Sequence, residues 1–312
     1  MWIFLALTAA VSTAMRDVAS KRAVRSMDPV PVALGVAAVP TVLLGGIVLA
    51  TGPAAPGDGF WLALVVSGGI NAVATPLIVV ALQRSDLSLV TPLTSLTPLF
   101  MLVTGAVVLG EVPGPRGIAG VVTIVAGAWL LALPARHQGA LGPFRAVLGD
   151  PGARAMLLVA FLYSISATYD KVGAQASSPL LWAASINGVV TVAMAAVMVA
   201  GVRTRRRAAA APPVPWGAGP GCGGGGGDGG AAGDGRVVAM VLLAGLFAAI
   251  MAAAQMTAIL LTLAAYVIAV KRTSTLFGVM LGHAVFHEQH VRERLVGAVV
   301  MLAGFVILTF DG

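Results

Sequence analysis

The chain has 312 residues, of which 58% are hydrophobic and only 10% are charged, and its mean hydropathy is +0.96. This composition excludes a water-soluble globular domain, because too few polar residues are present to cover one of this size. The net charge of +7 does not indicate nucleic-acid binding, since Lys and Arg stand mostly between the apolar runs. With Cys222 as the single cysteine, an intrachain disulfide and a thiolate metal site are also excluded.

Apolar runs of about 20 residues, the length that crosses a membrane as a helix, follow one another along the chain. The first run lacks the basic start and the cleavage site of a signal peptide, so we interpret it as a spanning helix. Most connections are short, which favours antiparallel neighbours in a compact bundle. We predict an all-α membrane protein with ten transmembrane helices, over residues 2–19, 30–50, 60–82, 87–109, 117–134, 155–172, 179–201, 237–258, 262–286 and 294–310.

Two connections are longer than the others. Residues 135–153 separate the two halves, and residues 202–235 contain an Arg cluster, three prolines and a nearly pure Gly tract. A segment with so little to bury is expected to be a disordered loop. The Gly tract is not followed by Gly-Lys-Ser/Thr, so we do not interpret it as a phosphate-binding loop.

Two segments of the chain repeat each other. Thr94–Glu111 reads TSLTPLFMLVTGAVVLGE and Lys271–Glu288 reads KRTSTLFGVMLGHAVFHE, at a separation of 177 positions, and a Gly-x6-Gly pattern follows each. Lys21 and Lys171, in the first helix of each half, are only 150 positions apart. The loop at 202–235 supplies an insertion that accounts for the difference.

The repeat divides the chain into two five-helix units, over residues 1–134 and 154–312. Because five is an odd number, the second unit enters the membrane in the opposite sense to the first. Inverted repeats of this kind are typical of secondary transporters, whose substrate site lies between the repeats near the middle of the bilayer. Basic residues gather in the loops after the odd-numbered helices, which predicts that these loops are cytoplasmic and that both termini face outward.

A family resemblance rests on Pro98-Leu99-Phe100, Gly105, Gly110-Glu111, Gly120, Gly127 and the second copy that ends at His287-Glu288. In these residues the chain resembles the EamA family of the drug/metabolite transporter superfamily over nearly its whole length. The resemblance implies a ten-helix carrier of small metabolites in a bacterial inner membrane, with a central cavity that opens alternately to either side. The second half departs from the pattern, with Thr275 in place of Pro98 and Lys271-Arg272 in place of Thr94-Ser95. We therefore look for substrate-specific chemistry in the second half.

Lys271 and Arg272 are the first candidates, because both stand about a third of the way into the predicted ninth helix. A charged side chain at such depth costs about 2.5–3.5 kcal/mol and normally faces a cavity or a partner. We interpret at least one of the two as an anion site or counter-ion for the transported molecule. Since adjacent residues diverge by about 100° on a helix, only one is expected to face the cavity. The alternative is that both snorkel or pair with an acidic residue.

Lys21 and Lys171 stand at the end of the first helix in each half, in the contexts RDVASK and TYDK. They either line the substrate pathway or snorkel to the interface, and both interpretations stay open. Asp17 and Asp170 are close by and are candidates for proton coupling. The alternative for each aspartate is a local ion pair with the neighbouring base.

Glu111 and Glu288 close the fourth helix of each half, where a carboxylate opposes the helix dipole and needs a cation or backbone donors. In an inverted repeat Glu111 faces the same side as Lys171, and Glu288 the same side as Lys21. We predict either two symmetry-related closing pairs or two glutamates that only organise the turn into the fifth helix.

Weaker polar candidates stand alone in apolar spans, and their default role is a hydrogen bond to a neighbouring helix; they are Asn71, Gln255 and Tyr266. The histidines offer little for a metal. His283 and His287 face the same way on a helix, but HEQH lacks the spacer of the HExxH motif and no third distant ligand is evident. We predict no metal site.

No nucleophile–base–acid set and no nucleotide-binding motif is evident in the sequence, so we predict no catalytic residue and no cofactor. We predict a secondary transporter that exports a small polar or amphipathic metabolite by alternating access, with a carboxylate, a phosphate or an amino acid favoured by Lys271-Arg272. Its expected partners are the substrate, the bilayer and H⁺ as a coupling ion, without nucleic acid, in a monomer or homodimer. The alternatives are a lipid-linked sugar flippase and an intramembrane metalloenzyme using His283, His287 and Glu288.

Overall fold

The computed structural model describes residues 1–52, 55–84, 91–132, 150–210, 231–278, 280 and 291–310. Within these residues the regular structure is helical throughout, and five helices are long and apolar enough to cross a membrane. The prediction of an all-α protein is thus confirmed for the part of the chain described. The elements are α1 (Trp2–Val24), α2 (Pro29–Thr51), α3 (Phe60–Arg84), η1 (Thr91–Leu96), α5 (Thr97–Leu109), α6 (Pro115–Ala132), α8 (Pro151–Gln175), α9 (Pro179–Ala210), α10 (Ala231–Leu261), α11 (Ala264–Lys271) and α13 (Val291–Thr309).

The predicted fourth span is interrupted, which corrects the continuous helix expected over 87–109. It consists of the 3-10 helix η1 followed by α5, and residues 85–90 lie outside the described part. Pro98 stands in the first turn of α5. A proline there has no N–H to continue the preceding helical hydrogen bonds, but its fixed φ suits a helix start. The proline therefore explains why one helix ends and another begins at this point.

The predicted ninth span is also interrupted, 177 positions later. α11 ends at Lys271, a turn covers Arg272 and Thr273, and a further helical segment begins at Ser274. No proline causes this break. Instead, the Thr273 hydroxyl donates to the Val270 carbonyl at 2.7 Å and the Thr275 hydroxyl donates to the Arg272 carbonyl at 2.8 Å. Such bonds offer the backbone carbonyls an alternative to the helical ladder.

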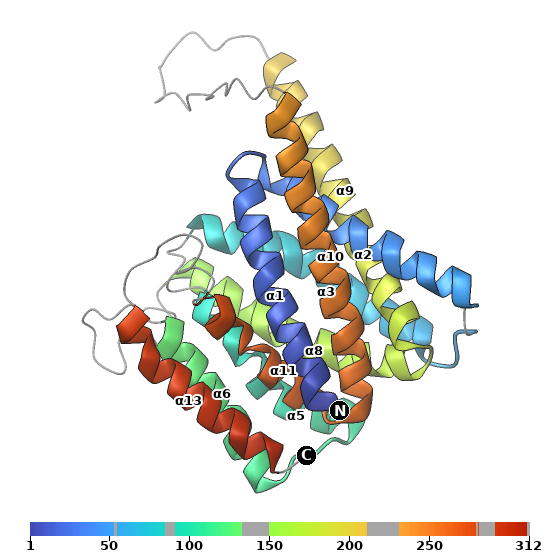
Figure 1. Ribbon diagram of the computed structural model, residues 1–312. Helices are drawn as coiled ribbons and strands as arrows, with labels where there is room; N and C mark the ends of the chain where they lie inside the picture. The colour runs from blue at the N-terminus through green and yellow to red at the C-terminus, as the bar shows by residue number, and fades with distance from the viewer. Residues whose placement is uncertain are drawn as a thin grey trace.

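The predicted loop over 202–235 is shorter than expected. α9 continues to Ala210, and α10 begins at Ala231, while residues 211–230 lie outside the described part. Arg and Ala have high helix propensity, so the basic and Ala-rich flanks of the Gly tract extend the two helices. Figure 1 shows both of them projecting beyond the rest of the bundle.

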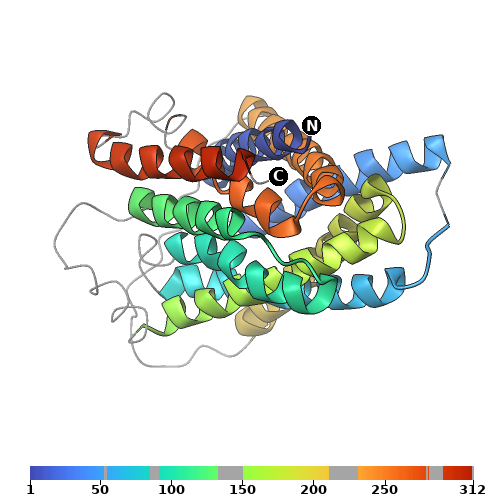
Figure 2. The ribbon, with the colours of Figure 1, turned by 90° about the horizontal axis from the view of Figure 1, so that it is seen from below.

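α6 and α13 pack side by side, as Figures 1 and 2 both show. A Cβ added to Gly120 would lie 3.2 Å from the Gly304 carbonyl, and one added to Gly127 would lie 2.8 Å from the Gly297 carbonyl. The two Gly-x6-Gly patterns therefore face each other on antiparallel helices. Without a side chain at these positions the backbones approach closely, which is how membrane helices gain packing energy.

The remaining helices form cross-half pairs, with α1 on α10, α3 on α8, and α2 on α9. The hydroxyls of Thr41 on α2 and Thr191 on α9 lie 3.1 Å apart. A Cβ at Gly68 of α3 would lie 3.0 Å from the Val189 side chain. In the other half, a Cβ at Gly245 of α10 would lie 2.4 Å from Val39. Every large helix interface thus joins one half of the chain to the other.

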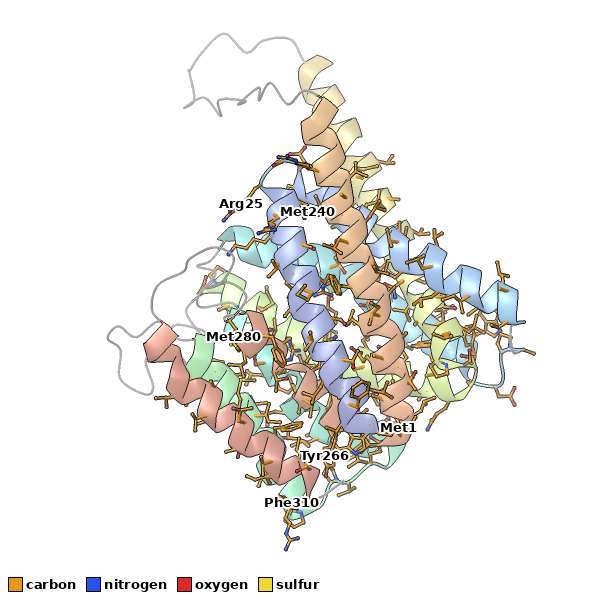
Figure 3. The ribbon with its side chains drawn as sticks, in the orientation of Figure 1. Met1, Arg25, Met240, Tyr266, Met280 and Phe310 are labelled. Carbon is orange, nitrogen blue, oxygen red and sulfur yellow. The ribbon has the colours of Figure 1, made fainter. Side chains whose placement is uncertain are left out.

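The two termini lie at the same end of the bundle (Figure 1). Figure 3 shows Met1 and Phe310 at this end, and Arg25 and Met240 at the opposite one. We call the end with Met1 and Phe310 the terminal end. We call the opposite end, where α9 and α10 project, the arm end.

Candidate functional site

A charged site forms where α11 ends. Lys271, the last residue of α11, donates from Nζ to Oε1 of Gln255 on α10 at 2.6 Å. Gln255 is buried, with 7% of its surface exposed. The sequence placed Lys271 inside a continuous helix, and the break corrects this position. The side chain instead leaves the helix at its C-terminus, where a cation interacts favourably with the helix dipole.

Arg272 occupies the turn that follows. Its Nε atom is buried and has no hydrogen-bond partner in the part of the chain that the structure describes. Tyr163 of α8 lies close enough to interact electrostatically with Arg272 and with Arg16 of α1. The Tyr163 hydroxyl also shares a hydrogen bond with Thr75 of α3. Four elements thus contribute to the surroundings of one guanidinium.

Two carboxylates lie within electrostatic range of Lys271, namely Asp17 and Asp170. Asp17 accepts two hydrogen bonds from Arg16, from Nη2 at 2.7 Å and from Nε at 3.0 Å. This local ion pair is the alternative that the sequence left open for Asp17. We use the name central cluster for the five charged residues Arg16, Asp17, Asp170, Lys271 and Arg272.

Asp170 is held by neutral donors. Its Oδ1 accepts from the Ser67 hydroxyl at 2.6 Å and from the Trp182 indole N–H at 3.1 Å. Asn71 braces this arrangement, because its amide donates to the Ser67 carbonyl and to the Ser166 hydroxyl, both at 2.8 Å. Asp170 is buried and does not pair with its neighbour in sequence, so the local ion pair suggested as one alternative is wrong for this residue.

Lys171 turns the other way and forms an ion pair with Glu111, with the Lys171 side chain buried and the Glu111 side chain partly buried. Lys171 also donates to the Thr262 carbonyl at 2.6 Å, and the second carboxylate oxygen of Glu111 accepts from the Ala264 N–H at 3.0 Å. Gly110 ends α5 with φ +69°, a conformation that glycine adopts without strain, and so delivers Glu111 to this point. Glu111 is therefore compensated by a cation and by the positive end of α11.

The other predicted residues lie apart from these groups. Lys21 is exposed on α1, whereas its counterpart Lys171 is buried. Tyr266 is buried and packs against Trp2, with ring centroids 6.4 Å apart, in the terminal half of the bundle (Figure 3). His283, His287 and Glu288 lie outside the described residues. Among the residues described, no group of three His, Cys, Asp or Glu side chains is placed to hold a metal.

Sequence reasoning missed five contributors to the site: Arg16, Ser67, Tyr163, Ser166 and Trp182. Arg16 marked only the end of the first apolar run. Serines pass unnoticed in apolar helices because they also serve as small packing residues. Tyr163, however, carried the same signal as Tyr266, an isolated polar aromatic in an apolar span.

Residues 1–133 match the model of the EamA-like transporter family, which belongs to the drug/metabolite transporter superfamily. The resemblance seen in the sequence is thus confirmed for residues 1–133. A solved structure titled "Crystal structure of protein" shares the fold with a TM-score of 0.69 and 15% sequence identity, covering 99% of this chain and 96% of the other. No curated protein matches the chain. The family and the apolar helices together identify a multi-pass membrane protein.

Proposed function

We propose that the chain is a secondary transporter working by alternating access, from the premise that its residues 1–133 match the EamA-like transporter family. The transported molecule is a small polar or amphipathic metabolite, moved outward across a bacterial inner membrane. The observation that carries the proposal is the central cluster. Four charged side chains from α1, α8 and the turn after α11 lie within electrostatic range of Lys271, and a charge inside a membrane-spanning segment is costly unless it serves a substrate or ion pathway.

The contacts between the halves support an inverted repeat. Thr41 and Thr191 are 150 positions apart and contact each other, as two residues would that are exchanged by a twofold axis between them. The same operation exchanges the contact of Gly68 with Val189 for that of Gly245 with Val39. This correspondence requires counterpart residues to be 150 positions apart in the early helices and 177 positions apart in the later ones. These are the two separations found between repeated residues in the sequence.

The last helix of each half fits the same axis. At a separation of 177 positions, Gly297 is the counterpart of Gly120, and Gly304 is the counterpart of Gly127. The contact of Gly120 with Gly304 therefore corresponds to the contact of Gly297 with Gly127. Because α6 and α13 are antiparallel, the axis lies across the helices and hence in the plane of the membrane. Repeats related in this way exchange their inward and outward ends when one rocks against the other.

The Glu111–Lys171 pair supplies a gate in this scheme. It ties α5, α8 and the start of α11 together, and the two side chains are only 8% and 14% exposed, which fits an end of the pathway that is closed. The symmetry-related position carries Lys21, which is exposed. We propose that the two ends close in alternation, and that the Glu111–Lys171 pair closes one of them.

Transport is tested with purified protein in proteoliposomes. A thermal-shift screen of metabolites first selects a compound, and counterflow of its radiolabelled form into preloaded vesicles then measures exchange. We expect uptake above that of protein-free vesicles. If compounds that stabilise the protein never exchange across the membrane, the protein binds them without carrying them, and the proposal is wrong.

The gate is tested by cross-linking in a Cys222→Ser background, which removes the single native thiol. Glu111→Cys and Lys171→Cys are joined by a short methanethiosulfonate cross-linker that dithiothreitol cleaves. We expect the cross-linked protein to lose counterflow and to regain it after reduction. Each single-cysteine variant, treated with the same reagent, is the matched control. Undiminished flux in the cross-linked protein would show that this end does not move.

A further inference from the structure

The central cluster has an unequal number of positive and negative side chains. Arg16, Lys271 and Arg272 are cationic, while Asp17 and Asp170 are the two carboxylates within range. Asp17 is engaged by Arg16 at 2.7 Å, and Asp170 interacts through space with Lys271. Within the described residues one positive charge is left over. Among the side chains that the structure describes, the cluster is therefore short of one anion.

The surplus charge belongs to Arg272. Its Nε is buried and unpartnered, and its electrostatic neighbour is the phenol of Tyr163 rather than a carboxylate. A buried polar group without a partner is rare, because it loses its hydrogen bonds to water and gains none in return. For a guanidinium among apolar helices the penalty is larger still. Such an arrangement calls for a ligand that completes it.

We propose that Arg272 binds an oxyanion of the transported molecule, a carboxylate or a phosphate, with the Tyr163 hydroxyl beside it. This inference rests on the proposed transport function and names its substrate class. The guanidinium edge formed by Nε and one Nη matches two oxygens of either group, so the unpartnered Nε is one half of a bidentate site. A single negative charge on the substrate balances the cluster.

Lys271 has a different part in the same site. Its Nζ is already engaged by Gln255 at 2.6 Å, so it sets the potential of the site without needing to touch the anion. A lysine also lacks the planar fork that holds two oxygens at once. Arg272→Lys therefore keeps the charge and loses the bidentate contact, which separates recognition from simple attraction.

The test is the melting temperature of purified full-length protein with three matched pairs of probes. These are benzoate and benzamide, lactate and lactamide, and glucose 6-phosphate and glucose. We expect at least one anion, at a concentration near 100 times its Kd, to raise Tm by about 5 °C, while its uncharged counterpart does not. Comparing the first two pairs with the third distinguishes a carboxylate from a phosphate.

Variants locate the effect. Arg272→Gln is expected to abolish the anion-dependent shift and Arg272→Lys to weaken binding at least tenfold, whereas Arg116→Gln, at an exposed arginine that begins α6, leaves it unchanged. Without ligand, Arg272→Gln should melt at or above the wild-type temperature, because it removes an uncompensated charge. If Arg272→Gln instead melts lower or does not fold, Arg272 has a structural partner and the proposal is overturned.

The remaining outcomes are equally decisive. The proposal fails if none of the three anions shifts the wild-type protein, if the uncharged counterparts shift it equally, or if Arg272→Gln keeps the shift. Counterflow separates this failure from that of the transport function. Exchange of a neutral compound without any anion effect leaves the transporter standing and overturns the anion site. Anion binding without exchange supports the anion site and overturns the proposed transport function.

Discussion

The Glu111–Lys171 pair allows a quantitative prediction, because both partners are buried, with 14% and 8% of their side chains exposed. Glu111→Gln leaves the Lys171 ammonium without its counter-charge while retaining an oxygen to accept the Ala264 N–H. Removing one partner of a buried ion pair costs about 3–5 kcal/mol. We expect the lower end of this range, since Lys171 keeps the Thr262 carbonyl as an acceptor at 2.6 Å. At about 2–4 °C per kcal/mol, Tm should fall by about 6–12 °C.

A double-mutant cycle shows whether this loss belongs to the pair. Lys171→Met alone strands the carboxylate, whereas Glu111→Gln combined with Lys171→Met removes both charges together. Because replacing a whole buried pair is often neutral, the double variant should melt above either single variant, with a coupling of about 2 kcal/mol. The four proteins are compared by intrinsic tryptophan fluorescence during heating. Additive losses, with a coupling under about 0.5 kcal/mol, would refute the reasoning.

The Arg16–Asp17 pair is the matched control. Its side chains are 30% and 59% exposed, and exposed ion pairs typically contribute about 0–1 kcal/mol. Asp17→Asn should therefore lower Tm far less than Glu111→Gln does. If the two substitutions cost the same, burial does not explain the effect at Glu111.

Three further substitutions test the packing, the cluster and the coupling. Gly127→Val should prevent recovery of folded protein, because its Cβ would lie 2.5 Å from a backbone nitrogen of α13. The control Gly69→Ala, whose Cβ would have nothing within 4 Å, should give a normal yield in the same purification. Equal yields of the two variants would contradict the close packing of α6 on α13. Lys271→Met should leave the protein folded and inserted but abolish counterflow, and wild-type flux would count against a role in the pathway. Asp170→Asn keeps an oxygen that accepts from Ser67 and Trp182, so the variant should fold and lose only the response of its flux to an imposed pH gradient. An unchanged response would exclude the Asp170 carboxylate from proton coupling.

The positions of the helices follow from hydropathy, and their ends follow less well. Apolar runs marked all of the helices described, because burial in lipid demands about 20 apolar residues whatever the neighbours are. The breaks at Leu96 and Thr273 were not predicted. Both lie inside apolar runs, and a window average does not register one proline or two threonine hydroxyls that compete for backbone carbonyls.

The candidate site was predictable in its charges and not in its contacts. Lys271, Arg272 and Asp170 were conspicuous, since each is an ionisable residue in or near an apolar span. Their partners Ser67 and Trp182 are ordinary residues in a membrane helix, and a single sequence does not reveal which helices meet. The ion pair of Lys171 is an exception, because an odd number of helices per half placed it on the same side as Glu111.

The duplication sorts the residues by function. Several positions that kept their identity in both halves lie at contacts between the halves: Thr41 contacts Thr191, and Gly120 lies against Gly304, the counterpart of Gly127. A residue on or near a twofold axis meets its own counterpart, so one change alters both sides of the interface at once. In the proposed inverted repeat this doubling would oppose divergence at such contacts.

The central cluster is built from positions where the halves differ. Lys271 and Arg272 correspond to Thr94 and Ser95, and Asp170 corresponds to Ser20. A small metabolite has no twofold symmetry, so a site on the axis that recognises one charged end must break the symmetry of the repeats that enclose it. In the proposed mechanism Lys21 and Lys171 are the same residue in both halves for the opposite reason, since each end of the pathway would have to close in its turn. Divergence at the cluster and identity at the gates are both expected of a duplicated carrier, and a structural scaffold would require neither.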